Sequence, residues 1–310
     1  MAGHSKKVVL VALLGNTIIT IVKFIVALFT RSAAMLAEAI HSLADTGNQG
    51  LLLLGLHRSQ KPADANHPFG YGKEQYFWSF VVANMLFFIG AVVSVYEGVS
   101  KLSHPHPIES AWLIYTILAV SFSIEFFAFR TAFIVFKKSR VKGQSYFSAV
   151  RNMKDSNVLV VLLEDSAALT GLLIAFLGVL LTELTGIAVF DALASILIGV
   201  VLAVVAMLLA WKTKELLIGE SAKPSDLVAM RAVLDKCDQV KNVGELFTMH
   251  MAPDRILLGL NLEFIDELTS NDIESVIDEL EASLKAAVPS VDRIFIEADE
   301  LVVRKRTSSV

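Results

Sequence analysis

Four polar or ionisable residues recur at helical spacing inside a segment that is otherwise apolar enough to cross a membrane. They lie in the stretch AEAIHSLADTGNQG and are Glu38, His41, Asp45 and Asn48. His41 and Asp45 are four positions apart, so one turn of helix places them on the same face. A charge at the centre of a bilayer costs about 3 kcal/mol or more and is kept chiefly where it lines a pathway or binds something. Imidazole and carboxylate groups without a nearby thiolate suggest a divalent metal ion.

A second acidic pair, Glu164 and Asp165, lies in the apolar stretch VLVVLLEDSAALTGLLIAF. Asp165 falls at a depth comparable to that of Asp45. We therefore expect these two carboxylates to meet. One helix cannot surround an ion by itself, so a second helix must complete the shell. Glu164 is about 100° around the helix from Asp165, so it is a candidate fourth ligand, a proton carrier or the partner of another helix. The alternative for His41 and Asp45 is a helix–helix hydrogen bond without metal.

Six apolar segments supply the helices that would hold these residues. Each has roughly 20–26 residues, which is enough to cross a hydrocarbon core. They cover about 7–29, 33–57, 76–100, 111–136, 157–182 and 187–211. The chain of 310 residues is 55% hydrophobic and 19% charged, with a mean hydropathy of +0.61. We therefore predict a membrane all-α fold, a bundle of six transmembrane helices in residues 1–215, followed by a cytoplasmic C-terminal domain in 216–310.

The region after the Lys223–Pro224 break alternates between helical and strand patterns. The patterns predict a helix over 225–239, strands over 242–252 and 256–267, a helix over 270–288 and a strand over 292–299. Ser225 and either Ser270 or Asn271 are the expected helix caps, and His250 is expected to be structural rather than a ligand. The order αββαβ predicts a two-layer α+β domain.

Basic residues gather in the loops on one side of the predicted bundle, whereas the loops on the other side have only Arg31 and Lys101. The positive-inside rule then places both termini and the C-terminal domain in the cytoplasm. The first apolar segment is too long for a signal-peptide core, and neither a cleavage pattern nor a transit peptide is apparent. We expect a multi-pass protein of a prokaryotic cytoplasmic (inner) membrane.

Composition and motifs argue against several classes of protein. The only cysteine, Cys237, excludes an intramolecular disulfide and a Cys-based metal cluster within one chain. With a formal net charge of −4 and no basic stripe carrying interleaved aromatics, nucleic acid is not an expected partner. An intramembrane metalloprotease is disfavoured because no span carries an HExxH motif.

Four further ionisable residues have more than one interpretation. Lys23 lies near the outer third of its span, where it is expected to snorkel to the interface. Glu125 lies deep enough in its span to pair with Lys23 or to take part in a proton path, and both interpretations stay open. Asp64 and His67 are three positions apart in a loop with Gly and Pro, where an ordinary exposed loop is favoured over a metal site.

With these residues in place, the chain resembles the cation diffusion facilitator family over nearly its whole length. The resemblance rests on the six spans, the cytoplasmic ends, the HSLAD pair, HPFGYGKEQY at the start of the third span and the αββαβ tail. The stretches AEAIHSLADTGNQGLLLLG and VLLEDSAALTG are most similar to the branch that contains the animal mitochondrial zinc exporter.

The resemblance implies a tetrahedral transport site, usually loaded with Zn²⁺, between the second and fifth spans, with protons moving in exchange. His41, Asp45 and Asp165 match its positions, whereas Val161 stands where the family commonly has His or Asp. Glu164, Asn48 or water must then complete the shell. An oxygen-richer site would also suit Mn²⁺, Fe²⁺ or Co²⁺.

Other family sites match less well. Asp64 and His67 fit an interfacial loop site in which Tyr71 replaces a usual third ligand. Positions that resemble the regulatory zinc ligands of the tail read Gly244, Asn261, Glu297 and Asp299. Because no His remains among them, that site is expected to be absent or weak.

The function expected from these features is efflux of a divalent metal cation, as a Zn²⁺/H⁺ antiporter with alternating access. The chain is not expected to be an enzyme or to carry a cofactor, since the metal is the transported substrate. Its partners would be the cation, protons, the lipid bilayer and, by resemblance, a second copy in a homodimer. Glu38, Asn48, Asp64 and His67 are secondary candidates for metal contact. The alternatives are a non-transporting, metal-responsive membrane scaffold, a Mn²⁺, Fe²⁺ or Co²⁺ transporter, and an ion channel.

Overall fold

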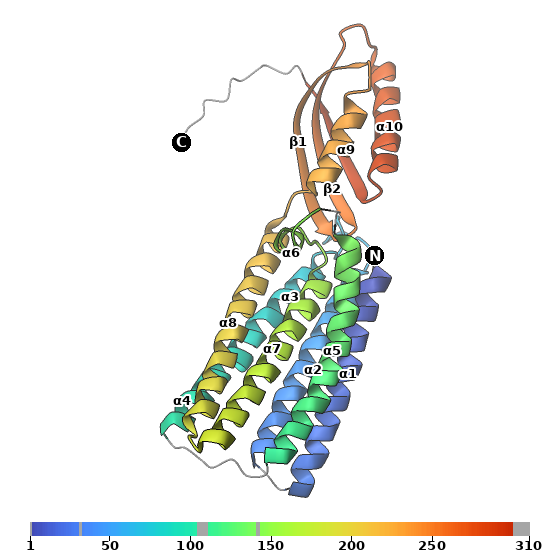
Figure 1. Cartoon of the computed structure of the whole chain (residues 1–310). Helices are drawn as coiled ribbons and strands as arrows, with labels where there is room; N and C mark the ends of the chain where they lie inside the picture. The colour runs from blue at the N-terminus through green and yellow to red at the C-terminus, as the bar shows by residue number, and fades with distance from the viewer. Residues whose placement is uncertain (1, 31–32, 104–110, 141–142, 300–310) are drawn as a thin grey trace. The chain divides into compact units, whose positions relative to one another are not determined.

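The computed structural model describes residues 2–30, 33–103, 111–140 and 143–299, and the chain divides into two compact units, Met1–Leu217 and Ile218–Val310. Within these ranges the side chains of 2–4, 26–27, 29–30, 33–41, 111 and 113 are not described. Long helices lying side by side make up the first unit, and the second unit contains the strands (Figure 1).

The first unit consists mainly of long helices. Its elements are α1 (Ala2–Thr30), α2 (Ala33–Ser59), α3 (Glu74–Met85), η1 (Leu86–Val92), α4 (Val93–Ser103), α5 (Ala111–Ser139), α6 (Tyr146–Arg151), α7 (Ser156–Thr185) and α8 (Val189–Ile218). Here α3, η1 and α4 form one continuous segment, in which η1 is a π-helical stretch of seven residues. The predicted third span is therefore one helix with an altered hydrogen-bond pattern at its centre, a feature that sequence periodicity does not reveal.

Among the residues that the structure describes, five helical segments are long and apolar enough to cross a membrane. They are Ser5–Ile25, Glu74–Ser103, Ile114–Ser139, Ser156–Thr185 and Val189–Ile218. The remaining predicted span, 33–57, lies within α2, which is helical over its whole length and carries the polar stripe. The prediction of a six-helix bundle with an α+β tail is confirmed, with helices that extend a few residues beyond the predicted spans.

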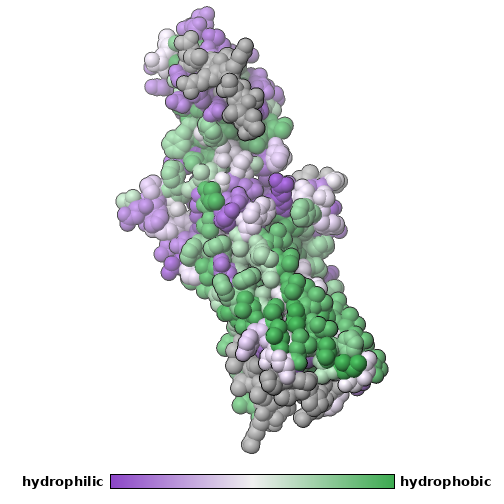
Figure 2. Space-filling model, turned by 90° about the vertical axis from the view of Figure 1, so that its left-hand side faces the viewer, coloured by the Kyte–Doolittle hydropathy of each residue, from purple (hydrophilic) through white to green (hydrophobic). Residues whose placement is uncertain are grey.

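Apolar side chains face outward as well as inward in the helical unit. On α8, Leu197, Val200 and Val204 are exposed, whereas Leu209 is completely buried. Figure 2 shows apolar side chains gathered on the surface of the helices. Because a helix that is apolar all round needs an apolar solvent on its outer face, these helices are membrane-embedded. The chain is a multi-pass integral membrane protein.

Small residues let α8 approach its neighbours closely. A Cβ atom added at Gly98 of α4 would lie 2.8 Å from the carbonyl oxygen of Ala192 on α8. One added at Gly199 of α8 would lie 2.9 Å from the carbonyl oxygen of Ala91. Gly178 of α7 packs against α8 in the same way, since a Cβ added there would lie 2.5 Å from Ala194 Cβ.

The basic connection between α5 and α7 is more structured than its polar sequence indicates. It contains the short helix α6, which Ser145 caps by accepting a hydrogen bond from the backbone N–H of Ser148. The buried ammonium group of Lys212 donates to the carbonyl of Arg151 at the end of α6. Asp155 then caps α7. These capping and buried polar contacts depend on residues from separate elements, so periodicity alone does not predict them.

The second unit has the predicted order αββαβ. Its elements are α9 (Pro224–Leu234), β1 (Val240–Ala252), β2 (Arg255–Phe264), α10 (Ser270–Ala287) and β3 (Val291–Ala298). The strand order is β1-β2-β3, with β1 and β2 antiparallel and β2 and β3 parallel. Ile256, Leu258 and Leu262 of β2 are fully buried against a core that includes Leu284 of α10. The central strand carries the alternation of a sheet with one covered face.

Both helix caps predicted for this unit are wrong. Helix α9 begins at Pro224, and Lys223 is its N-cap, because proline with its fixed φ and missing N–H suits the first helical position. Ser225 lies inside the first turn and donates to the carboxylate of Asp226. Helix α10 is capped one residue earlier than predicted, by Thr269, whose side chain forms a reciprocal capping box with Asp272.

We expect Thr269→Ala to loosen the start of α10. Loss of the cap should cost about 1 kcal/mol of local stability, seen as faster amide hydrogen exchange in the first turn of α10 in the full-length protein. The Thr269 hydrogen bonds lower the pKa of Asp272, so the contribution of that carboxylate is present at neutral pH and is lost as pH falls through its native pKa. Ser275→Ala, on the exposed side of the same helix, is the matched control and should leave exchange unchanged. Equal exchange in Thr269→Ala and wild type would contradict the role of this cap.

Candidate cation site

Asp165 lies on the inner face of α7 and is almost completely removed from solvent. Its exposed fraction is 2%, and its Oδ2 atom has no hydrogen-bond partner among the residues that the structure describes. A buried carboxylate normally needs a partner, because its desolvation is costly. This oxygen is therefore a candidate position for a bound cation.

Glu164, the neighbour of Asp165, is held by α2. Its two carboxylate oxygens accept hydrogen bonds from the amide groups of Asn48 (Oε1, 3.3 Å) and Gln49 (Oε2, 2.9 Å). The amide oxygens of Asn48 and Gln49 are buried and lack hydrogen-bond partners within the described ranges. Two amide donors thus turn Glu164 toward α2, which matches one of the three roles considered for it, that of partner to another helix.

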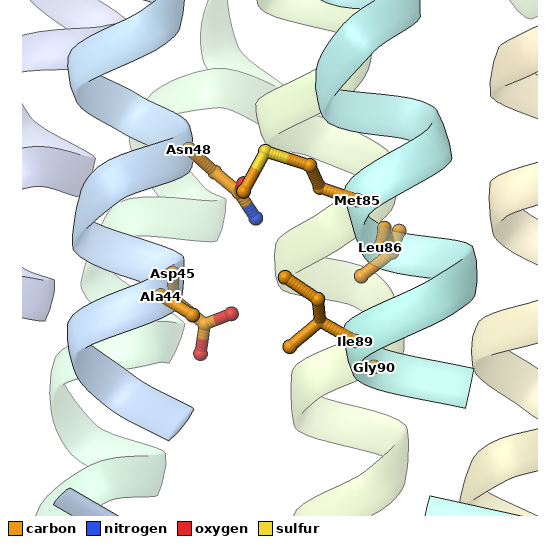
Figure 3. A pocket seen from close by; sticks show the side chains of 7 residues that line it. All are labelled: Ala44, Asp45, Asn48, Met85, Leu86, Ile89 and Gly90. Atoms are coloured by element: carbon orange, nitrogen blue, oxygen red, sulfur yellow. The ribbon is translucent and has the colours of Figure 1, made fainter. Parts of the chain in front are cut away.

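Asp45 of α2 lines a small cavity facing α3 and η1 (Figure 3). Asp45 and Asn48 project from one side, while Met85, Leu86, Ile89 and Gly90 close the other. The space open to the centre of a water molecule is about 10 Å³, which is close to the minimum for one water-sized guest. The Asp45 carboxylate is also within electrostatic range of Glu164 and Asp165, so the structure brings the acids of α2 and α7 together.

A further acid, Glu125 of α5, joins this group from a third helix. Its carboxylate interacts electrostatically with those of Asp45 and Asp165 and with the ammonium group of Lys23. Lys23 donates a hydrogen bond to Ser42 of α2 (2.8 Å). Lys23 is therefore turned toward α2, rather than extended to the interface as the snorkelling interpretation expects.

His41 and Glu38 lie in α2, but their side chains fall outside the described residues. Among the side chains that are described, no three from His, Cys, Asp and Glu are arranged as ligands of one metal ion. The ligand set of His41, Asp45, Asp165 and Glu164 therefore stays a prediction. The structure adds Gln49 and Glu125 to its surroundings. Gln49 is four positions after Asp45, and this helical spacing could have indicated its role.

The loop pair Asp64 and His67 forms a compact turn with Tyr71. The Tyr71 hydroxyl donates to Asp64 Oδ2 (2.7 Å), and backbone N–H groups of Asn66 and His67 donate to Oδ1. These hydrogen bonds, that of Tyr71 foremost, hold the pKa of Asp64 below its ordinary value. Because both carboxylate oxygens accept hydrogen bonds, the geometry matches the ordinary-loop interpretation.

In the second unit, three of the tail positions singled out above, Gly244, Asn261 and Glu297, lie in strands, and Asp299 directly follows β3. Asn261 and Glu297 are partners in the register of β2 and β3, and the Asn261 amide donates to the Glu297 carboxylate (3.3 Å). His250 is buried, and its Nδ1 atom is 3.1 Å from the carbonyl oxygen of Ala252. This contact is consistent with the structural role expected for His250.

Comparison with known proteins places this membrane fold in a class. Residues 9–218 match the family model of the cation efflux transmembrane domain. The proton-coupled zinc antiporter SLC30A9, mitochondrial, of Homo sapiens is 33% identical over 323 aligned positions, covering 98% of this chain and 57% of that protein. Metal tolerance protein C4 of Arabidopsis thaliana is 32% identical over 225 positions (72% and 49%). The manganese efflux system protein MneP of Bacillus subtilis is 23% identical over 301 positions (95% and 96%).

These matches define a family of membrane transporters, not of enzymes. The chain belongs to the cation efflux family. The resemblance to the branch with the mitochondrial zinc exporter is also confirmed. The chain spans about half the length of the first of these relatives.

Proposed function

We propose that this protein exports a divalent metal cation, chiefly Zn²⁺, in exchange for protons. The observation that carries the proposal is the acidic group of half-buried Asp45 with buried Glu164 and Asp165, contributed by helices that cross the membrane. Such charges at bilayer depth are retained for a bound or moving ion. The human relative is named a proton-coupled zinc antiporter, which supports both the metal and the exchanged ion.

His41, Asp45 and Asp165 are the proposed ligands, with Glu164 as a fourth oxygen donor. In that role Glu164 would bind the metal through a lone pair that its amide partners on α2 leave open, so one carboxylate would connect α2, α7 and the cation. Metal binds the deprotonated forms of His and carboxylate, so protons compete for the same atoms. The ligands themselves thereby couple metal release to proton uptake, as an antiporter with alternating access requires.

The donor set also supports transport of harder cations. Val161 is fully buried and apolar, so the position one turn before Asp165 offers no ligand, and oxygen atoms outnumber nitrogen in the proposed site. Oxygen-rich sites suit Mn²⁺ better than nitrogen-rich ones. The Bacillus relative is named a manganese efflux protein, and Mn²⁺ is accordingly the second candidate substrate.

The proposed setting follows from the loop charges and the family. Basic loops favour cytoplasmic termini, with residues 1–215 in a prokaryotic inner membrane and 216–310 as the cytoplasmic domain. The working unit would be a homodimer. The metal would enter from the cytoplasm and leave on the opposite side, against an inward flow of protons.

Transport by the purified protein in liposomes tests this function. With an imposed pH gradient and a zinc-sensitive dye inside, we expect saturable Zn²⁺ flux that stops when a protonophore collapses the gradient. Parallel assays with Mn²⁺, Fe²⁺, Co²⁺ and Cd²⁺ rank the substrates. Flux that neither saturates nor depends on the pH gradient would indicate a channel, and no flux of any of these metals would favour a scaffold.

A further inference from the structure

We propose that Glu125 of α5 is an oxygen donor to the transported cation, so that the site is built from three helices rather than from α2 and α7 alone. The inference rests on the proposed function. It assigns to α5 the ligand that Val161 cannot provide and thereby bears on which metals the protein selects.

Glu125 lies on a stripe of α5 whose other members are buried. Ser121, Ala128 and Ala132 are buried and share one stripe of α5 with Glu125, since positions four, seven and eleven apart lie on one helical face. Phe126 and Phe127, the next two residues in the chain, are half-exposed or more. The glutamate thus stands on the inner face, in a helix whose aromatic side chains point outward.

The partners of Glu125 come from other helices. Its carboxylate is within electrostatic range of Asp45 on α2 and of Glu164 and Asp165 on α7. Lys23 of α1 is an attractive partner for it. Carboxylates from three helices therefore lie within electrostatic range of one another, and a bound cation would offset their mutual repulsion.

An independent observation indicates where that cation lies. The Oδ2 atom of Asp165 has no hydrogen-bond partner among the described residues, although the side chain is only 2% exposed. On the same face of α7, one turn away, Val161 is fully buried and has no polar atom to offer. A cation at Asp165 therefore takes its other ligands mainly from other helices, and Glu125 is the α5 carboxylate within electrostatic range of Asp165.

Isothermal titration of the purified full-length protein with Zn²⁺ and with Mn²⁺ tests the assignment. Glu125→Gln keeps the shape of the side chain and removes its charge, and we expect its Zn²⁺ affinity to fall about tenfold or more. Mn²⁺ affinity should fall further, because Mn²⁺ depends more on carboxylate oxygen than Zn²⁺ does. Glu183→Gln is the matched control, since Glu183 is exposed and accepts a hydrogen bond from Tyr115, and it should bind both metals as wild type does.

Two results would overturn the assignment. One is Zn²⁺ affinity in Glu125→Gln within twofold of wild type. The other is an equal loss for Zn²⁺ and Mn²⁺, which a general change of charge would produce without any lost ligand. If Glu125→Gln does not fold, Glu125→Met, an unbranched apolar replacement, is read by the same criteria. Wild-type flux in liposomes is measured separately, so a wild type that binds zinc without moving it would refute the proposed function and not the role of Glu125.

Discussion

Asp165→Asn should reduce metal transport about 100-fold or more while leaving the protein at least as stable as wild type. The substitution keeps the size of the side chain but removes the charge that binds the cation. Asp165 Oδ2 has no hydrogen-bond partner within the described residues. Replacing the buried carboxylate with a neutral amide therefore removes a desolvation penalty without breaking a hydrogen bond of that atom. Loss of function with retained or raised stability is the signature of a binding residue.

The measurement pairs initial Zn²⁺ flux in liposomes with the thermal unfolding midpoint in detergent. Asp191→Asn makes the same chemical change and is the matched control. Asp191 lies at the start of α8, away from the acidic group, where it forms an ion pair with Lys101. It should transport at a rate close to that of wild type. Transport by Asp165→Asn within threefold of wild type would remove Asp165 from the site.

Gly98→Ala should destabilise the helical unit by about 1–3 kcal/mol, although alanine favours a helix more than glycine does. The added Cβ would lie 2.6 Å from Ile196 Cγ1 and 2.8 Å from both the Ala192 oxygen and the Ile196 nitrogen. Two of these atoms belong to the backbone of α8, so the clash cannot be relieved by a change of rotamer. The helices α4 and α8 must separate, and the dispersion contacts along their seam weaken.

Unfolding of the full-length protein in detergent measures this effect. Gly50→Ala of α2 is the control, because a Cβ added there meets nothing within 4 Å, and it should stabilise the helix by up to about 1 kcal/mol. The same substitution thus has opposite signs at two helical glycines. Equal unfolding midpoints for Gly98→Ala and wild type would show that α4 and α8 do not pack as described.

Long apolar runs and alternating strands were readily predicted from the sequence because their signals are local. The spans over 76–100 and 157–182 and the two strands of the hairpin appear where the patterns place them. The depth match between Asp45 and Asp165 used only helix rise and span direction, and the two carboxylates do lie within electrostatic range. Thr269 was missed as a cap because neighbouring Ser, Thr and Asn residues are equally suitable by composition.

The sequence by itself determined the class of fold, the helices that carry charge into the membrane and the residue types available to a cation. Hydrophobic length and spacing along one chain are sufficient for that, because they act within single elements. Only the tertiary structure decided which charges meet. It turned Glu164 toward the amides of Asn48 and Gln49 and brought Glu125 of α5 within electrostatic range of acids on two other helices. The rotation of each helix about its own axis follows from packing against its neighbours, and no periodicity within one segment encodes it.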